Sequence, residues 1–245
     1  MAATNVRFWF DPVCPFCWLT SKWLRMVHEQ RDLRVEWRFI SLRLINEHLD
    51  YAAHFPPEYE AGHTAGLRLL RVAARTRADH GNDGLDALQA ALGRAIFDSM
   101  PMDQVMRPAD GAAGNGHPAF LVPALREAGL PADLAEAFDD DSYDVVIRAE
   151  GEEALAVTGK DVGTPIIQLD PPDGVGFFGP VISRLPDPDR AAELWDHAIG
   201  LTSFPGFAEL KRSLRELPQL VALGVDPGDI GKVEDWHAGS RRTTR

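Results

Sequence analysis

The sequence has only two cysteines, Cys14 and Cys17, among its 245 residues, and they lie three positions apart. Secreted domains that depend on disulfides carry more cysteines and distribute them along the chain. A structural zinc site needs four ligands, and the sequence has neither a second cysteine pair nor two histidines at HxxH or HxxxH spacing. These absences exclude a disulfide framework and disfavour a metal site, so the close pair points to catalytic chemistry.

Long apolar runs and an excess of basic charge are also missing. No stretch reaches the ~18 apolar residues of a membrane span, and the start of the chain lacks the basic and apolar regions of a secretory leader. The formal net charge is -12, and an acidic surface repels the phosphates of nucleic acids. We therefore expect a cytoplasmic protein that binds neither membranes nor nucleic acid.

Strand patterns occur in two separated parts of the chain. The first part predicts a strand, a helix and a strand, at Val6–Phe10, Cys14–Gln30 and Leu33–Ile40. The second part predicts two strands and a helix, at Ile166–Leu169, Gly176–Phe178 and Asp189–Gly200. Together these parts predict one small mixed sheet with helices packed on it.

The long middle of the chain shows helical patterns only, at Glu58–Asp79, Leu85–Phe97, Leu121–Ala128, Ala132–Phe138 and Asp144–Val157. We therefore predict a discontinuous α/β domain formed by residues 1–43 and 159–204, interrupted by an α-helical insert over residues 44–158. The Gly- and Pro-rich loop Pro101–Pro118 is expected to be a mobile lid. The C-terminal extension, 205–245, is expected to hold a short helix at Phe207–Leu217 and to end in a poorly ordered tail.

The segment Cys14-Pro15-Phe16-Cys17 comes directly after a predicted strand and opens a predicted helix. That context is typical of a thioredoxin-like redox motif. A thiol at a helix N-terminus faces unpaired N–H groups and the positive end of the helix dipole, which stabilise its thiolate. The thiolate is the nucleophile, and a second cysteine one turn on lies within disulfide reach.

A second element, Thr164-Pro165, immediately precedes the predicted strand Ile166–Leu169. In combination with an N-terminal CxxC it is similar to the cis-proline loop of thioredoxin-fold proteins. A cis Pro165 would leave the Thr164 backbone free to pair with a substrate or thiol cofactor beside the Cys14 sulfur.

The segments FWFDPVCPFCW, DVGTP and FFGPV, with the helical insert between them, resemble the DsbA-like branch of the thioredoxin superfamily. Within that branch the chain is most similar to the actinobacterial mycothiol-dependent reductases of nitroreductase type. The resemblance implies a thioredoxin-like fold with a large all-helical insertion, a cytosolic location and mycothiol as the reducing co-substrate, with no bound cofactor. It also implies that disulfides or small electrophiles such as nitro-aromatics are the substrates.

The resemblance assigns roles to individual residues. Cys14 would be the nucleophile and Cys17 the resolving thiol, and a further set would line the substrate or cofactor site: Pro15, Phe16, Trp18, Asn46, Tyr59, Thr164 and Pro165. Two positions depart from the family pattern. Phe16 replaces a tryptophan between the cysteines, and Phe97 stands where a polar pocket residue is expected.

Two other functions remain open. A 2-hydroxychromene-2-carboxylate isomerase or kappa-type thiol transferase shares the architecture, but such enzymes use a single Ser or Cys, and the retained Cys17 argues against them. A non-enzymatic dithiol metal carrier would need stoichiometric metal.

Several other patterns favour an ordinary structural role. The GxGxxG spacing at 174–179 follows a turn and precedes a proline, which predicts a β-hairpin rather than a dinucleotide site. His54 and His63 are expected to be solvated or at a pocket edge. Arg68, Arg71 and Arg75 form a stripe on one helical face, which is expected to be solvated, with a cofactor carboxylate as the alternative ligand.

The strand before the motif has no acidic residue, since positions 8 and 10 are phenylalanine. Asp11 is the nearest acid, and we expect it to be half exposed. Proton transfer to the Cys17 thiol would then use water, Asp11 or the cofactor.

Overall fold

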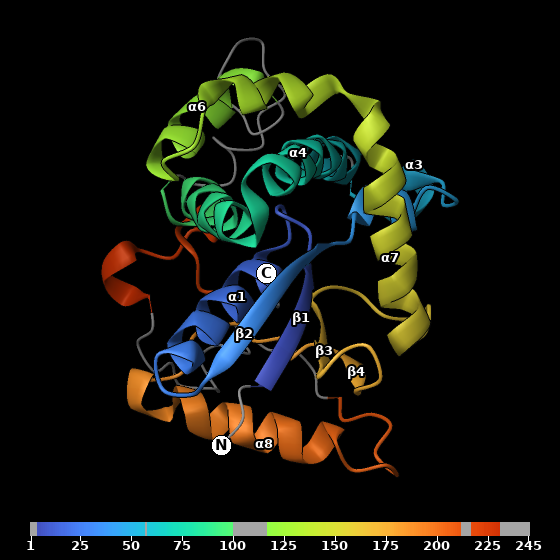
Figure 1. Cartoon of the computed structure of the whole chain (residues 1–245), viewed down its shortest axis with the longest axis vertical. Helices are drawn as coiled ribbons and strands as arrows, with labels where there is room; N and C mark the ends of the chain where they lie inside the picture. Colours follow the sequence, from blue (N-terminus) through green and yellow to red (C-terminus); the bar gives the residue numbers. More distant parts are fainter. Residues whose placement is uncertain (1–3, 57, 100–116, 212–216, 231–245) are drawn as a thin grey trace.

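A four-stranded mixed sheet lies at the centre of the computed structural model, which describes residues 4–56, 58–99, 117–211 and 217–230 (Figure 1). The strands are β1 (Thr4–Phe10), β2 (Leu33–Phe39), β3 (Ile166–Leu169) and β4 (Gly176–Phe178), in the order β2-β1-β3-β4. β1 pairs parallel with β2 and antiparallel with β3, and β3 pairs antiparallel with β4. This is the strand arrangement expected of a thioredoxin-like domain, and all four strand predictions are confirmed.

The alternation of side chains along β1 divides the core between the two faces of the sheet. Phe8 and Phe10 lie in the main core, where both rings make edge contacts with Trp37. Trp9 points to the other face and joins a small second core with Ile166. Helices therefore have to cover both faces.

Helix α1 (Pro15–His28) is the crossover between the parallel strands, and α8 (Ala191–Thr202) packs against it (Figure 1). The Trp23 and Trp195 rings lie 5.7 Å apart in this contact, and the Trp23 indole N–H donates to the Ala191 carbonyl at 3.0 Å. Helix α7 (Asp144–Thr158) contacts β2, β3 and β4 and supplies Ala154 to the second core.

The remaining helices belong to the middle of the chain, above the sheet in Figure 1. They are α2 (Leu42–Ile45), α3 (Tyr51–His54), α4 (Glu58–Gly93), the π-helical turn η1 (Arg94–Asp98), α6 (Pro118–Glu127) and the 3-10 turns η2 (Ala132–Asp139) and η3 (Asp141–Tyr143). Shorter 3-10 turns follow at η4 (Pro188–Arg190), η5 (Val221–Leu223) and η6 (Pro227–Asp229). None of the helices in the described ranges is long and apolar enough to cross a membrane.

The helical predictions need three corrections. The segments predicted at 58–79 and 85–97 run on as α4 and η1, with a kink where Gly81 adopts a φ of +69°. The segment 132–138 is 3-10 rather than α-helical. No helix forms over 207–211, and residues 212–216 of that prediction lie outside the described part of the chain.

The predicted lid loop Pro101–Pro118 also lies outside the described residues up to position 116, as does most of the predicted tail. The domain boundaries at residues 43 and 159 stay a prediction. Helix α7, which we assigned to the insert, packs on the sheet itself.

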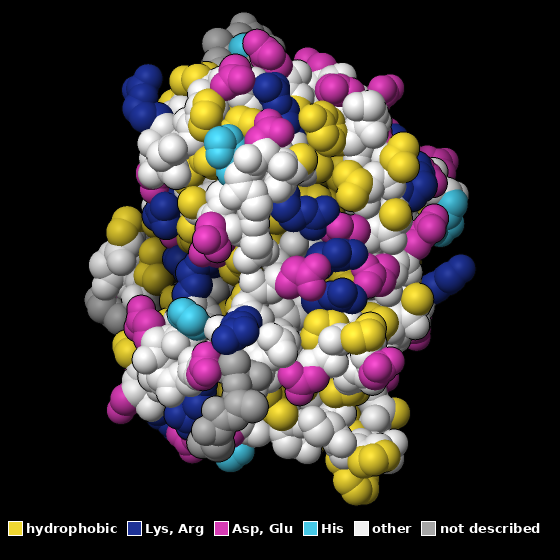
Figure 2. Space-filling view, viewed as in Figure 1, with side chains coloured by type: hydrophobic (Ala, Val, Ile, Leu, Met, Phe, Trp, Pro, Cys, Tyr) yellow, Lys and Arg dark blue, Asp and Glu magenta, His cyan; other side chains and the backbone are white. Residues whose placement is uncertain are grey.

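The arginine stripe of α4 is ion-paired rather than merely solvated. Arg68 pairs with Asp139, Arg71 makes two bonds of 2.7 and 2.8 Å to Asp144, and Arg75 bonds Asp133 at 3.2 Å. These acids lie on η2 and at the start of α7, so the stripe holds α4 against its neighbours. Figure 2 shows the same mixture over one whole face, where basic and acidic side chains are interspersed.

Candidate active site

The two cysteines lie at the junction between β1 and α1. Cys14 is the N-cap of α1, and its backbone N–H donates to the Asp11 carbonyl at 3.1 Å. Pro15 takes the first helical position. An N–H there would have no partner within the helix, so its absence in proline costs no hydrogen bond. The Cys17 N–H donates to the Cys14 Sγ at 3.4 Å, so the sulfur takes the place that a serine or aspartate oxygen has in an ordinary helix cap.

This geometry makes the two thiols unlike each other. Both are free and buried, with Cys14 5% and Cys17 1% exposed. The pKa of Cys14 lies below its ordinary value because Cys17 hydrogen-bonds its sulfur, with smaller help from Thr164 and against the effect of burial. Burial and the adjacent Cys14 raise the pKa of Cys17 well above its ordinary value. Of the two thiols, Cys14 is therefore the one that ionises more readily.

The Thr164–Pro165 segment lies beside that sulfur, although it is 150 residues away in sequence. The Thr164–Pro165 peptide is cis, and the Cys14 thiol donates to the Thr164 carbonyl at 3.8 Å. Pairing of β3 with β1 places this segment here, because Pro165 immediately precedes Ile166, which is opposite Trp9. The two motifs of the sequence thus meet at one point.

Asp11 differs from the sequence prediction. It is fully buried rather than half exposed. Its carboxylate accepts the Val13 N–H at 2.9 Å and the Leu42 N–H at 2.8 Å. Burial raises the pKa of Asp11 to about 7, against the effect of these two bonds. The buried carboxyl that the strand lacks is therefore supplied by the residue that follows it.

The residues on either side of Cys17 belong mainly to the core. Phe16 is half-buried and packs on the main core. Trp18 is 3% exposed, and its indole N–H donates to Asp98 at 3.0 Å. Gly93 at the end of α4 lies flat on this ring, since a Cβ there would be 2.1 Å from it. Trp18 therefore connects α1 to the end of α4.

Asn46 and Tyr59 lie at the entry to the insert. Asn46 ends α2, where its side-chain amide donates to the Leu42 carbonyl at 2.9 Å. Tyr59 is 43% exposed and stacks on Phe55. Within the described part of the chain, neither side chain is hydrogen-bonded to a cysteine, so their role in binding stays a prediction.

Two other side chains of the insert are more buried than expected. His63 is 9% exposed rather than solvated, bonds the Tyr51 hydroxyl at 3.2 Å, and has its pKa lowered by burial to about 4. His54 is exposed, as expected, and its ring bonds the Asp50 carbonyl. Phe97, at the expected pocket position, is fully buried in the main core.

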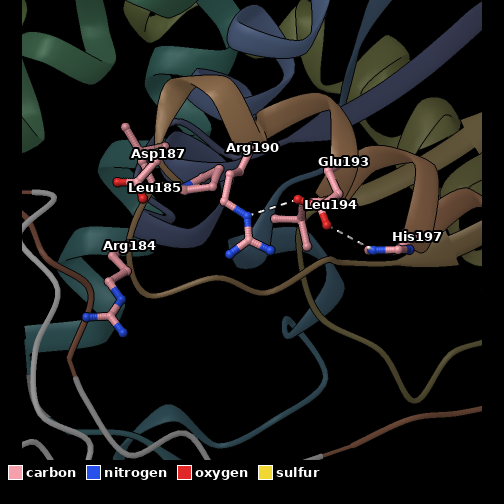
Figure 3. A pocket seen from close by; sticks show the side chains of 8 residues that line it. Arg184, Leu185, Asp187, Arg190, Glu193, Leu194 and His197 are labelled. Atoms are coloured by element: carbon pink, nitrogen blue, oxygen red, sulfur yellow. Dashed lines mark hydrogen bonds and ion pairs between the residues drawn. The ribbon is translucent and has the colours of Figure 1, made fainter.

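A cavity of about 280 Å³ lies elsewhere, between the 184–187 loop and the start of α8 (Figure 3). On the α8 side of this cavity, Glu193 bonds Arg190 at 2.9 Å and lies 3.7 Å from the His197 ring. Neither cysteine lines it. Within the described residues, no group of three or more His, Cys, Asp or Glu side chains is placed to hold a metal ion.

The hairpin prediction for 174–179 is confirmed. Residues 176–178 form strand β4, and a Cβ on Gly174 would be 1.6 Å from the Leu169 carbonyl oxygen. The glycine is required by this close approach of two backbones, not by a phosphate.

Comparison with solved structures bears on the fold. A solved structure from Nitrosomonas europaea, named "putative protein disulfide isomerase", has a TM-score of 0.50 at 14% identity and covers 81% of this chain and 98% of its own. A second structure, the cytosolic disulfide reductase DsbM from Pseudomonas aeruginosa, has a TM-score of 0.49 at 19% identity over 80% of this chain and 99% of its own. The first of these structures agrees with the fold described above, a thioredoxin-like sheet with a large helical segment.

Sequence comparison is more specific. The chain is 31% identical over 236 residues to an uncharacterized protein of Mycobacterium tuberculosis, Rv2286c, across 95% of this chain and 92% of that protein. The pattern of the Rv2466c-like family, described as mycothiol-dependent nitroreductase Rv2466c, matches residues 13–212, which include both cysteines and the cis-proline segment. The chain belongs to the Rv2466c-like family of mycothiol-dependent nitroreductases.

Proposed function

We propose that this chain is a thiol–disulfide oxidoreductase whose Cys14–Cys17 dithiol reduces small disulfides or electrophiles and is itself reduced by mycothiol. The observation that carries the proposal is the position of the Cys14 sulfur. It accepts an N–H at the start of α1 and lies 3.8 Å from the carbonyl before a cis proline.

The reaction with a disulfide has two steps. The Cys14 thiolate attacks one sulfur of the substrate, forms a mixed disulfide and releases the other half of the substrate as a thiolate. The Cys17 thiol then loses its proton and attacks the Cys14 sulfur, which releases the second half and leaves a Cys14–Cys17 disulfide. The substrate has gained two electrons and the protein has lost two.

Regeneration reverses this exchange with a low-molecular-weight thiol. One mycothiol molecule opens the Cys14–Cys17 disulfide by forming a mixed disulfide with Cys14, and a second displaces the first as the oxidised mycothiol disulfide. Two thiols are oxidised for each dithiol recovered. Family membership supports mycothiol as this thiol, and the proposal includes a cytoplasmic location, where thiol pools are kept reduced.

The unequal thiols fit this division of roles. A nucleophile needs a low pKa, and a resolving cysteine that remains protonated does not compete for the substrate. Pro15, Phe16 and Thr164 lie next to the reacting sulfur and would form the nearest wall of the substrate site. We assign Trp18, Asn46 and Tyr59 to more distant parts of that site.

The test compares the wild type with Cys14→Ser and Cys17→Ser. We expect Cys17→Ser, incubated with a disulfide substrate as the oxidant and with mycothiol, to accumulate a mixed disulfide with mycothiol, seen as an added mycothiol mass on Cys14, and to lose turnover. Cys14→Ser should form no adduct. If Cys17→Ser keeps full turnover with a thiol, the protein is a single-thiol transferase or isomerase and the proposal is wrong.

The thiol specificity needs its own assay. Oxidised wild-type protein is incubated separately with mycothiol, glutathione and a thioredoxin system, and its free thiols are counted over time. Mycothiol should restore both thiols fastest. Recovery with thioredoxin alone would contradict the mycothiol assignment and leave the dithiol chemistry intact.

A further inference from the structure

Asp11 is enclosed on every side, and it lies three residues before the nucleophile. Both carboxylate oxygens are fixed by backbone donors, Oδ1 by the Val13 N–H and Oδ2 by the Leu42 N–H. The first donor belongs to the turn that carries Cys14, and the second belongs to the start of α2. The carboxyl group thus joins the redox turn to the entry of the helical segment.

Helix α4 closes the remaining side. A Cβ on Gly66 would be 2.7 Å from the Asp11 Oδ1 and 2.7 Å from a methyl of Val13, so the helix lies directly on the carboxylate. Asp11 makes no ion pair with any of the described residues. When it is ionised, its charge is held by backbone donors alone and is not cancelled by a cation.

Several ionisable groups lie on the elements around it, namely Cys14 and Cys17 in the motif, Arg43 on α2, Tyr51 on α3, and Glu60 and His63 on α4. Arg43 is turned to the Tyr51 ring and pairs with Glu60 at 3.5 Å. Burial keeps the pKa of Tyr51 above, and that of His63 below, their ordinary values, so neither is charged near neutrality. Among these groups, the Cys14 thiolate is the negative charge that the Asp11 carboxylate repels.

We propose that Asp11 is a positioning residue that keeps the dithiol reducing, because its buried negative charge opposes the Cys14 thiolate. This inference rests on the proposed function. Reduction of the disulfide adds two electrons, supplied by two thiol molecules that become their own disulfide, and leaves Cys14 as thiolate and Cys17 as thiol. A charge that disfavours the thiolate disfavours the reduced form, so the protein gives up its electrons more readily.

The electrostatics of the site agree with this geometry. Hydrogen bonds, chiefly from Cys17, lower the pKa of Cys14, whereas burial and, to a smaller extent, the Asp11 charge raise it. Burial raises the pKa of Asp11 itself to about 7. Asp11 is therefore protonated and without effect in mild acid, and it opposes the thiolate only above about pH 7.

The test measures Asp11→Asn against the wild type in two ways. The rate of Cys14 alkylation by iodoacetamide is followed from pH 5.5 to 9, and the equilibrium between dithiol and disulfide is measured in a thiol redox buffer at pH 8. Above pH 7 we expect faster alkylation of the variant than of the wild type, because Cys14 ionises at a lower pH once the Asp11 charge is gone. The equilibrium should shift toward the dithiol by a factor of up to about ten, which corresponds to a potential up to about 30 mV higher.

The pH profile separates this role from a merely structural one. Alkylation of the two proteins should agree below pH 6, where Asp11 is protonated in the wild type, whereas a distorted variant would differ at every pH. Asp133→Asn is the control for loss of a carboxylate, because Asp133 is exposed on η2 and pairs with Arg75 at 3.2 Å, and it should change neither quantity.

Two results would overturn the inference. One is an Asp11→Asn protein with unchanged equilibrium and slowed displacement by Cys17, which would make Asp11 a proton acceptor. The other is a difference from the wild type that persists below pH 6. A wild-type protein with no redox-active dithiol would instead refute the proposed function, so the two failures are distinguishable.

Discussion

Replacement of Gly93 by alanine tests how the helical segment is attached beside the dithiol. Gly93 has ordinary helical angles, with φ -61° and ψ -42°, so its backbone accepts alanine. The added methyl carbon would lie 2.1, 2.4 and 2.5 Å from three atoms of the Trp18 indole. That ring cannot turn aside easily, because it is 3% exposed and its N–H is bonded to Asp98.

The magnitude follows from two opposing effects. Overpacking a well-filled core costs about 1–3 kcal/mol and occasionally more. Alanine in a helix interior gains roughly 0.5–1 kcal/mol over glycine. Because the overlap here is with a rigid ring, we expect a net loss of about 2 kcal/mol. For a chain of this size the melting temperature should fall by about 4–8 °C.

The assay is urea unfolding followed by tryptophan fluorescence, with Gly151→Ala as the matched control. Gly151 is a buried residue inside α7, and a Cβ there would meet no atom within 4 Å. The control should therefore be as stable as the wild type or slightly more so. If Gly93→Ala is as stable as Gly151→Ala, the packing of α4 on Trp18 is not as described and the reasoning is refuted.

Three further predictions concern the thiols and two buried ionisable groups. Iodoacetamide at mildly acidic pH should label Cys14 before Cys17, because the pKa of the first is lowered and that of the second is raised; mass spectrometry showing the reverse order would exchange their roles. The native pKa of His63 is about 4 instead of 6.5, so the unfolded chain binds the proton first and stability is lost as pH falls from 6.5 toward 4. His63→Gln should flatten that loss in urea titrations at pH 4.5 and 6.5, and an unchanged slope would contradict the burial of the ring. Glu150→Gln should lower the free energy of unfolding by about 3 kcal/mol, the lower end for breaking a buried ion pair. Glu150 bonds Arg77 at 2.6 Å and the Phe39 N–H at 2.9 Å. A loss below about 1 kcal/mol in the same titration would mean that this carboxylate is exposed to solvent and not buried.

The strands were predictable from the sequence because their apolar patterns are local. Ile166–Leu169 and Gly176–Phe178 form strands over the predicted residues, and the adjacent Thr164–Pro165 peptide is cis. The CxxC motif was equally visible, since its chemistry depends on four consecutive residues and a helix start. Pairing of β3 with β1 then brings the two motifs together.

The burial of Asp11 was not predictable in the same way. An Asp-Pro pair after a strand is typical of an exposed turn. Asp11 is buried because Gly66 of α4 lies against it. Gly66 is 55 positions further along the chain, and the pattern of that helix does not indicate which residue it covers. A glycine facing inward on α4 was the one available signal, because it permits a close approach. The pairing of the arginine stripe was missed for a related reason, since its acidic partners lie on separate turns.

Phe16, the second of the two residues between the cysteines, bears on the central claim. A positively charged side chain at this position would stabilise the thiolate and hence the reduced form. Phe16 offers an apolar ring that packs on the core. Phe16→His should therefore raise the reduction potential and lower the pKa of Cys14.

The most direct test is the reduction potential of the Cys14–Cys17 pair in the wild-type protein. It is measured by equilibration in mycothiol or glutathione redox buffers, with the dithiol fraction read by mass after alkylation. A reductase is expected to lie nearer thioredoxin, at ~-270 mV, than DsbA, at ~-120 mV. A value as high as that of DsbA would mean that the protein oxidises thiols, and would contradict the proposed reductase function even though the fold is DsbA-like.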